Sequence, residues 1–138
     1  MKRRIALLSA AVLMLSAIGF GTASAAGHLE PETVPGNDTC EGTKIEPVVS
    51  GTYALAGGGT VTITVRDTDD GPVFDFDASA DITIGSVTVK GGTNHNLYIF
   101  APAVNSAEGL HAPINPKNDK YFGLSHLCFE DVKKDDKK

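Results

Sequence analysis

Residues 60–66 (TVTITVR) alternate strictly between polar and apolar side chains. Because successive side chains of a β-strand point to opposite faces, this spacing predicts a strand with an apolar inner face and a threonine-rich outer face. After a turn signal at 67–71 (DTDDG), residues 73–77 (VFDFD) resume the alternation with Phe74 and Phe76 on one side. The two segments therefore predict a β-hairpin with one buried face and an acidic turn.

The next segments also contain apolar residues at every second position. Residues 82–89 (ITIGSVTV) place two β-branched residues before Gly85-Ser86 and two after it. Either a two-residue turn joins two short strands there, or a bulge at Gly85 keeps one strand's apolar face inward. Residues 97–100 (LYIF) are apolar on both faces, which is typical of a central strand. The whole chain has fifteen glycines and seven prolines, and residues 40–128 show no helical spacing. The chain is therefore predicted to be all-β, an antiparallel β-sandwich.

The N-terminus predicts export. Residues 2–4 (KRR) are basic, residues 5–20 are mostly apolar, and residues 23–25 (ASA) form a small-residue cleavage site, which is the order of a secretory signal peptide. We expect residues 1–25 to be removed, leaving a secreted, extracellular bacterial protein without a membrane span. Cleavage leaves nine basic and seventeen acidic residues, a net charge of −8. This charge repels phosphate backbones, so nucleic acid is not an expected partner.

Two cysteines, Cys40 and Cys128, remain after cleavage. Since disulfides persist in exported proteins, we expect one intramolecular bond to close the sandwich. Two free thiols or an intermolecular bond are the alternatives. The expected organisation is a flexible leader over residues 26–39, a β-sandwich domain over residues 40–129 and a disordered charged tail over residues 130–138.

Six short motifs follow one another in the second half of the chain. They are VTVKGG at 87–92, NLY at 96–98, GLHAP at 109–113, NP at 115–116, KYFGLSH at 120–126 and Phe129. In this order they resemble a group of small exported bacterial modules that occur alone or within surface and matrix proteins. The resemblance implies a β-module with no settled function and no catalytic residues to carry over. The group has glycine where this chain has Asp119, and a positive φ there would strain a non-glycine residue.

Amide, imidazole and phenol side chains gather in two stretches of the chain, residues 94–98 and 107–122. They are Asn94, His95, Asn96, Tyr98, His111, Asn115, Asn118 and Tyr121. Amides and aromatic faces bind sugars and peptides through forked hydrogen bonds and stacking, so these residues form a candidate ligand-binding set. The alternative is that asparagine serves the turns of a tight loop by bonding to nearby backbone.

The acidic turn is a candidate calcium site. Asp67, Asp69 and Asp70 offer the hard oxygen ligands that Ca²⁺ prefers. Gly71 and Ala78 occupy loop positions where an EF-hand needs oxygen ligands, and aspartate is a common turn residue in its own right. No other cofactor is expected.

Three histidines, His95, His111 and His126, offer imidazole ligands for Zn²⁺ if the fold brings them together. Their spacing matches no metal-binding motif. His126 lies two residues from Cys128, so its simpler role is that of a packed residue beside the disulfide.

Catalytic motifs are absent from the sequence. Ser125 and His126 are neighbours, so on a strand they point to opposite faces, and no nucleophile elbow surrounds the serine. We expect a secreted, non-enzymatic module with a recognition or structural role at the cell surface or in the matrix. Its partner would be an extracellular protein or glycan, or another copy of the chain through exposed strand edges. A small carboxylate-dependent hydrolase or a calcium-binding module is the alternative.

Overall fold

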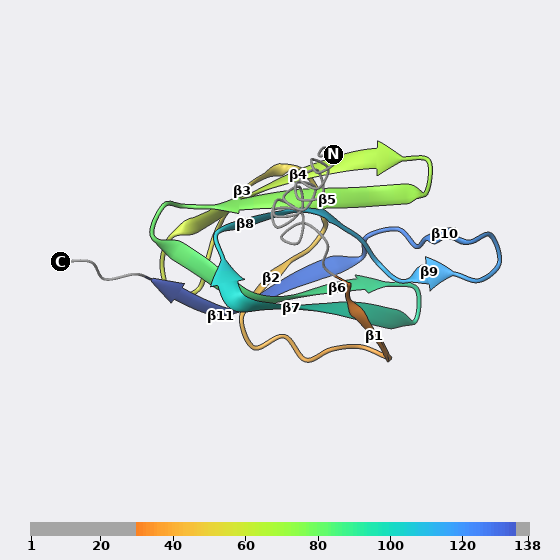
Figure 1. The fold of residues 1–138 in the computed structure, drawn as a ribbon, viewed down its shortest axis with the longest axis horizontal. Helices are drawn as coiled ribbons and strands as arrows, with labels where there is room; N and C mark the ends of the chain where they lie inside the picture. The colour runs from red at the N-terminus through yellow and green to blue at the C-terminus, as the bar shows by residue number, and fades with distance from the viewer. Residues whose placement is uncertain (1–29, 135–138) are drawn as a thin grey trace, which may run out of the picture. The chain divides into compact units, whose positions relative to one another are not determined.

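The computed structural model describes residues 30–134, so the predicted signal peptide lies outside the described part of the chain. One antiparallel sheet runs β1 (Glu32–Pro35), β7 (Asn94–Val104), β6 (Ile82–Gly91), β11 (His126–Lys134) and β2 (Thr43–Ile45) in spatial order. A second runs β3 (Gly51–Ala54), β4 (Thr60–Thr68), β5 (Gly71–Ala78) and β8 (Ser106–Leu110). A short hairpin pairs β9 (Ile114–Asn115) with β10 (Lys120–Tyr121) (Figure 1). Within residues 30–134, no helix has the length and apolar character needed to cross a membrane.

The two larger sheets form a sandwich, as the sequence predicts. The predicted hairpin is β4–β5, with Ile63 opposite Phe76, and its apolar face packs against β6 and β11 of the other sheet. Phe76 meets the fully buried Phe129 edge to face, with ring centroids 5.3 Å apart. Packing of this kind stabilises a core beyond its apolar area alone.

The glycine of the ITIGSVTV segment lies inside one continuous strand. Ile82, Ile84, Val87 and Val89 are all buried on this one strand, so the two-residue turn is wrong and the apolar residues stay inward. Register with β7 shifts between Ile84 and Ser86. A Cβ at Gly85 would lie 2.4 Å from Asp131 Oδ2, so the position admits only glycine beside the aspartate of β11.

Cys40 and Cys128 form the predicted disulfide, with their Cα atoms 5.7 Å apart. Cys128 is fully buried and lies between Leu127 and Phe129, whose side chains enter the core. Alternation along the strand therefore points Cys128 away from the core. The bond joins the segment before β2 to the outer face of the first sheet.

Residues 36–42, here called the strap, connect β1 at one edge of this sheet to β2 at the other (Figure 1). Histidine side chains on the outer face hold the strap. His95 Nδ1 lies 2.8 Å from Gly36 O, and His126 Nε2 lies 2.8 Å from Asp38 Oδ1. The strap therefore crosses the outer face of the sheet and is part of the domain.

The prediction of a flexible leader over residues 26–39 is wrong for β1 and the strap. Glu32 to Pro35 pair with β7, and the compact unit begins at Pro31. Three polar residues on the outer face, Thr88, Lys90 and His95, are 9% exposed or less. Proline and glycine suggested mobility, whereas here they belong to an extended segment that is held by long-range contacts.

The prediction of a disordered tail from residue 130 is also wrong as far as Lys134. β11 continues to that residue, and Val132 pairs with Ile84 of β6 and packs against the core. The segment predicted disorder because it is highly charged and has one apolar residue, Val132, to bury. It is nevertheless ordered as a strand because β6 supplies backbone hydrogen-bond partners along it. Residues 135–138 lie outside the described part.

Loss of the disulfide should lower the free energy of unfolding by about 4.5 kcal/mol, the chain-entropy value for a loop of this size, given the 88-residue separation. Urea denaturation of the oxidised protein and of a Cys40→Ser/Cys128→Ser variant measures the difference. An unchanged midpoint would contradict a structural role for the bond.

A candidate binding surface at one end of the sandwich

Residues 111–124 leave sheet geometry and fold back as the β9–β10 hairpin, which lies beyond the ends of the neighbouring strands in Figure 1. Its turn is built from asparagine. Asn115 Oδ1 accepts a hydrogen bond from Lys117 N, and Asn118 Oδ1 accepts one from Lys120 N, both at 3.0 Å. Asn115 and Asn118 were predicted as ligand-binding residues. Their side chains instead bond to nearby backbone, which is the alternative role of asparagine in a tight turn.

Asp119 ends this turn with a φ of 62°. The sequence predicted that a positive φ would strain a non-glycine residue here, and the backbone does adopt that conformation. Aspartate tolerates it better than most residues.

Residues 111–124 are here called the excursion, and two buried polar residues of β7 hold its start. Asn96 Nδ2 donates to His111 O at 3.0 Å, and the hydroxyl of Tyr98 accepts from His111 N at 2.9 Å. Both side chains are at most 2% exposed. Since a ligand has no access to them, these residues position the loop and do not bind a partner.

The His111 ring makes a further contact within the excursion. It stacks on Tyr121 with ring centroids 3.7 Å apart and an interplanar angle of 8°, and its Nδ1 lies 2.8 Å from Ala112 O. Both rings are half-buried. The stack joins the two arms of the excursion.

The acidic β4–β5 turn holds the other side of the hairpin through its backbone. Tyr121 N donates to Asp70 O and Lys120 Nζ donates to Asp69 O, each at 2.7 Å. A Cβ at Gly71 would lie 3.1 Å from Tyr121 atoms. Turn and hairpin therefore form one rigid end of the sandwich.

Glycines of the VKGG motif make room for the same excursion. A Cβ at Gly92 would lie 2.8 Å from the ring of Phe122, and one at Gly91 would lie 2.5 Å from Ala112 Cβ. Lys90 Nζ donates to Gly92 O at 2.6 Å. The motifs behind the family resemblance thus pack against one another, so much of that pattern serves to hold residues 111–124.

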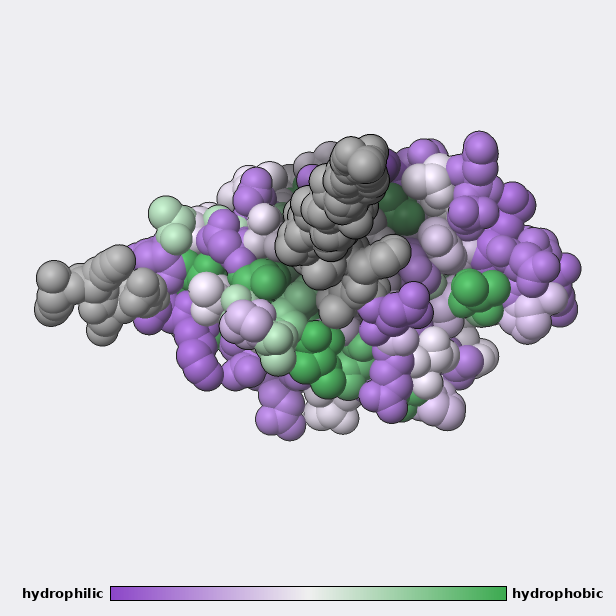
Figure 2. All heavy atoms as spheres, in the orientation of Figure 1, coloured by the Kyte–Doolittle hydropathy of each residue, from purple (hydrophilic) through white to green (hydrophobic). Residues whose placement is uncertain are grey.

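Most side chains of the hairpin between residues 114 and 120 are exposed. His95 lies under the strap and Asn94 is half-buried at the start of β7, so neither belongs to the hairpin surface. Ile114 is 55% exposed, and Figure 2 shows an isolated apolar group at this end, bordered by hydrophilic residues. The remaining candidate surface, here called the hairpin surface, consists of Ile114, Pro116, Lys117, Asn118 and Lys120.

The structure does not assemble the expected metal sites. Within residues 30–134, one group brings three potential ligand atoms within 4.8 Å of one another, and it consists of Cys40, Cys128 and Glu130. Asp67, Asp69 and Asp70 form no such group, nor do the three histidines. Sequence reasoning missed Glu130 because its nearness to the cysteines arises from β11, which extends beyond the predicted domain end.

Among the carboxyl groups of residues 30–134, Asp75 has a pKa that clearly departs from its ordinary value. The Arg66 guanidinium donates to both carboxylate oxygens, at 2.8 and 2.9 Å, and Gly109 N donates to Oδ1 at 2.9 Å. The hydrogen bond from Arg66 is the main cause that lowers the pKa of Asp75. The same contact raises the pKa of Arg66. A lowered pKa favours an ion-pairing role over a general acid.

Comparison with known protein families, with curated proteins and with solved structures returned no match.

Substitution of Gly92 by alanine should destabilise the domain in two ways. Its φ of 64° strains any side chain by about 1–2 kcal/mol, and the added Cβ meets Phe122. Gly109→Ala is the matched control, because its φ is 73° but nothing lies within 4 Å. Thermal unfolding should give a lower Tm for Gly92→Ala; equal Tm values would show that the excursion is not packed tightly there.

Acid should weaken the domain partly through Asp75. A carboxyl whose pKa is lower in the folded state contributes stability above its unfolded pKa of about 3.9, and that contribution is lost as pH falls below it. Denaturation at pH 7 and pH 3 should therefore show a smaller pH dependence for Asp75→Asn than for the wild type. Asp77→Asn, two residues along the exposed side of β5, is the control; an equal change in both variants would contradict the role of Asp75.

Proposed function

We propose that this protein is an exported, non-enzymatic module that binds an extracellular protein or glycan through the hairpin surface. The observation that carries the proposal is the combination of a rigid attachment with an exposed end. Side chains and backbone from β7, the β6–β7 turn and the β4–β5 turn hold the excursion, while Ile114 remains 55% exposed. Preorganisation of this kind lowers the entropy lost on binding.

The fold is consistent with an extracellular location. A disulfide that ties the strap to β11 persists in an oxidising compartment, and the leading residues have the order of a secretory signal peptide. The resemblance to exported surface and matrix modules favours the same setting. Loops on a rigid sandwich are a common place for recognition.

A carboxylate-dependent hydrolase receives no support from the acidic residues. Such an enzyme needs two carboxyl groups that face one cavity, one of them with a raised pKa. Asp67 is exposed near the end of β4, Asp69 and Asp70 are exposed on the turn that follows, and the pKa of Asp75 is lowered. The calcium alternative lacks a group of carboxylates within reach of one ion in residues 30–134.

The proposal is tested with a panel of soluble glycans and extracellular proteins. We expect one class of ligand to raise the Tm of the mature protein, and Ile114→Ser together with Lys117→Ala to weaken that binding at least tenfold. The Tm of the unliganded variant should remain unchanged, because both side chains are exposed.

Val49→Ser is the matched control, since Val49 is 54% exposed in the loop between β2 and β3. Binding that is lost equally in both variants, or in neither, would contradict a role for the hairpin surface. Elution as a concentration-dependent oligomer without a ligand response would favour a structural subunit instead.

A further inference from the structure

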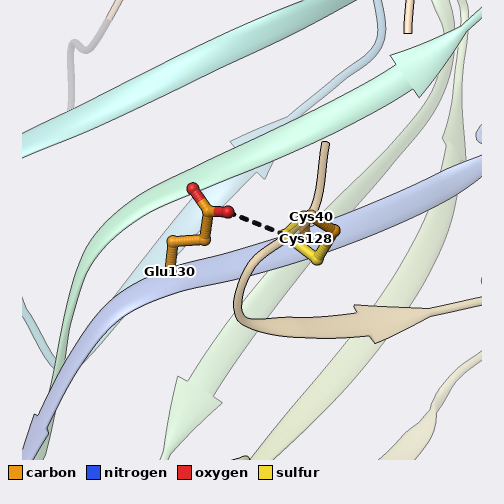
Figure 3. A group of neighbouring side chains, drawn as sticks. All are labelled: Cys40, Cys128 and Glu130. Atoms are coloured by element: carbon orange, nitrogen blue, oxygen red, sulfur yellow. Dashed lines mark hydrogen bonds between the residues drawn. A yellow bond between two sulfur atoms is a disulfide. The ribbon is translucent and has the colours of Figure 1, made fainter. Parts of the chain in front are cut away.

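Glu130 places a carboxylate beside the disulfide (Figure 3). Its Oε2 atom lies 3.5 Å from Cys128 Sγ and also accepts a hydrogen bond from Glu41 N at 2.7 Å. Since Glu41 belongs to the strap, the side chain of Glu130 is fixed from both sides. Two sulfur atoms and one oxygen are thus held within 4.8 Å of one another.

Reduction of the bond would leave two sulfur ligands beside the Glu130 carboxylate. Zn²⁺ accepts sulfur and oxygen ligands in one site, and Cys128 is fully buried, so a metal ion held there would be largely withdrawn from water.

The ligand spacing suits zinc. Zn–S bonds of about 2.3 Å and Zn–O bonds of about 2.0 Å at tetrahedral angles place sulfur and oxygen about 3.5 Å apart, which matches the distance from Cys128 Sγ to Glu130 Oε2. The two sulfurs, once unbonded, need a separation of about 3.8 Å on the same ion. Their Cα atoms, 5.7 Å apart, keep both thiols at the site.

Space for the ion and a further ligand lies next to Glu130. An open depression of about 520 Å³ is lined by Glu41, Gly42, Ser86, Glu130 and Asp131. The depression opens beside the Glu130 carboxylate, where water as a further ligand would complete a tetrahedral set with the three protein ligands.

We propose that Cys40, Cys128 and Glu130 bind Zn²⁺ when the disulfide is reduced by a dithiol. The dithiol gives two electrons and two protons to the sulfurs and becomes a cyclic disulfide, and zinc then displaces the two thiol protons. The metal ties the strap to β11 in place of the S–S bond. The domain thus has two ways to keep the strap closed, one oxidised and one reduced.

The test uses protein reduced with a non-chelating phosphine and titrated with Zn²⁺ against a chromophoric chelator. We expect one Zn²⁺ per chain, a rise in the Tm of the reduced protein, and with Co²⁺ an absorption spectrum typical of tetrahedral thiolate ligation. Glu130→Gln, which keeps an acceptor for Glu41 N, should weaken zinc binding at least tenfold. Oxidised wild type and the Cys40→Ser/Cys128→Ser variant should take up no zinc.

Glu108→Gln is the control for a general loss of negative charge, because Glu108 is exposed on β8 in the other sheet. It should bind zinc like the wild type. Zinc binding by two cysteines of an unfolded chain would not depend on Glu130, so equal affinity of Glu130→Gln and wild type would overturn the proposal. Failure of the reduced wild type to take up zinc would overturn it as well.

Discussion

The bond between Cys40 and Cys128 decides how the N-terminal part of the domain meets the sheet. It fixes the strap to β11, and the contact between Asp38 and His126 fixes it a second time. Beneath it, Lys90 and Thr88 are almost fully buried on what would otherwise be a solvated outer face. The strap therefore covers the part of the outer face around Thr88, Lys90 and His95, while Ile99 of β7 is 58% exposed.

Buried polar side chains and close packing also hold the excursion at the end of the sandwich. Asn96 and Tyr98 project from the inner face of β7 and bond to the backbone of His111. Gly91 and Gly92 leave the space that Ala112 and Phe122 occupy. Polar groups that are buried and paired specify one arrangement of a loop more strictly than apolar contacts do, so the hairpin surface is held in position. Within this surface, Ile114 and Lys117 remain exposed.

The strands were predictable from sequence because alternation at 60–66 and 73–77 reflects burial of one face, which is a local property. The positive φ of Asp119 was an expectation only through the resemblance, which has glycine at this position, because aspartate by itself does not require that conformation. The strap was not predictable, because its polar sequence shows no period and Asp38 meets a partner 88 residues away. Likewise, Asn96 and Tyr98 looked like ligand contacts, since residue type reveals hydrogen-bonding capacity but not the partner that tertiary structure supplies.

The contribution of β1 and the strap to stability is tested most directly by comparing the thermal unfolding of two oxidised chains, one that starts at residue 30 and one that starts at residue 40. Both contain the disulfide, but the shorter chain lacks β1 and the first half of the strap, including Asp38. The account predicts that thermal unfolding of the shorter chain occurs at least about 10 °C lower, as the loss of a few kcal/mol gives in a domain of this size. Equal melting temperatures would show that the domain begins at Cys40 and that the strap contributes nothing to its stability.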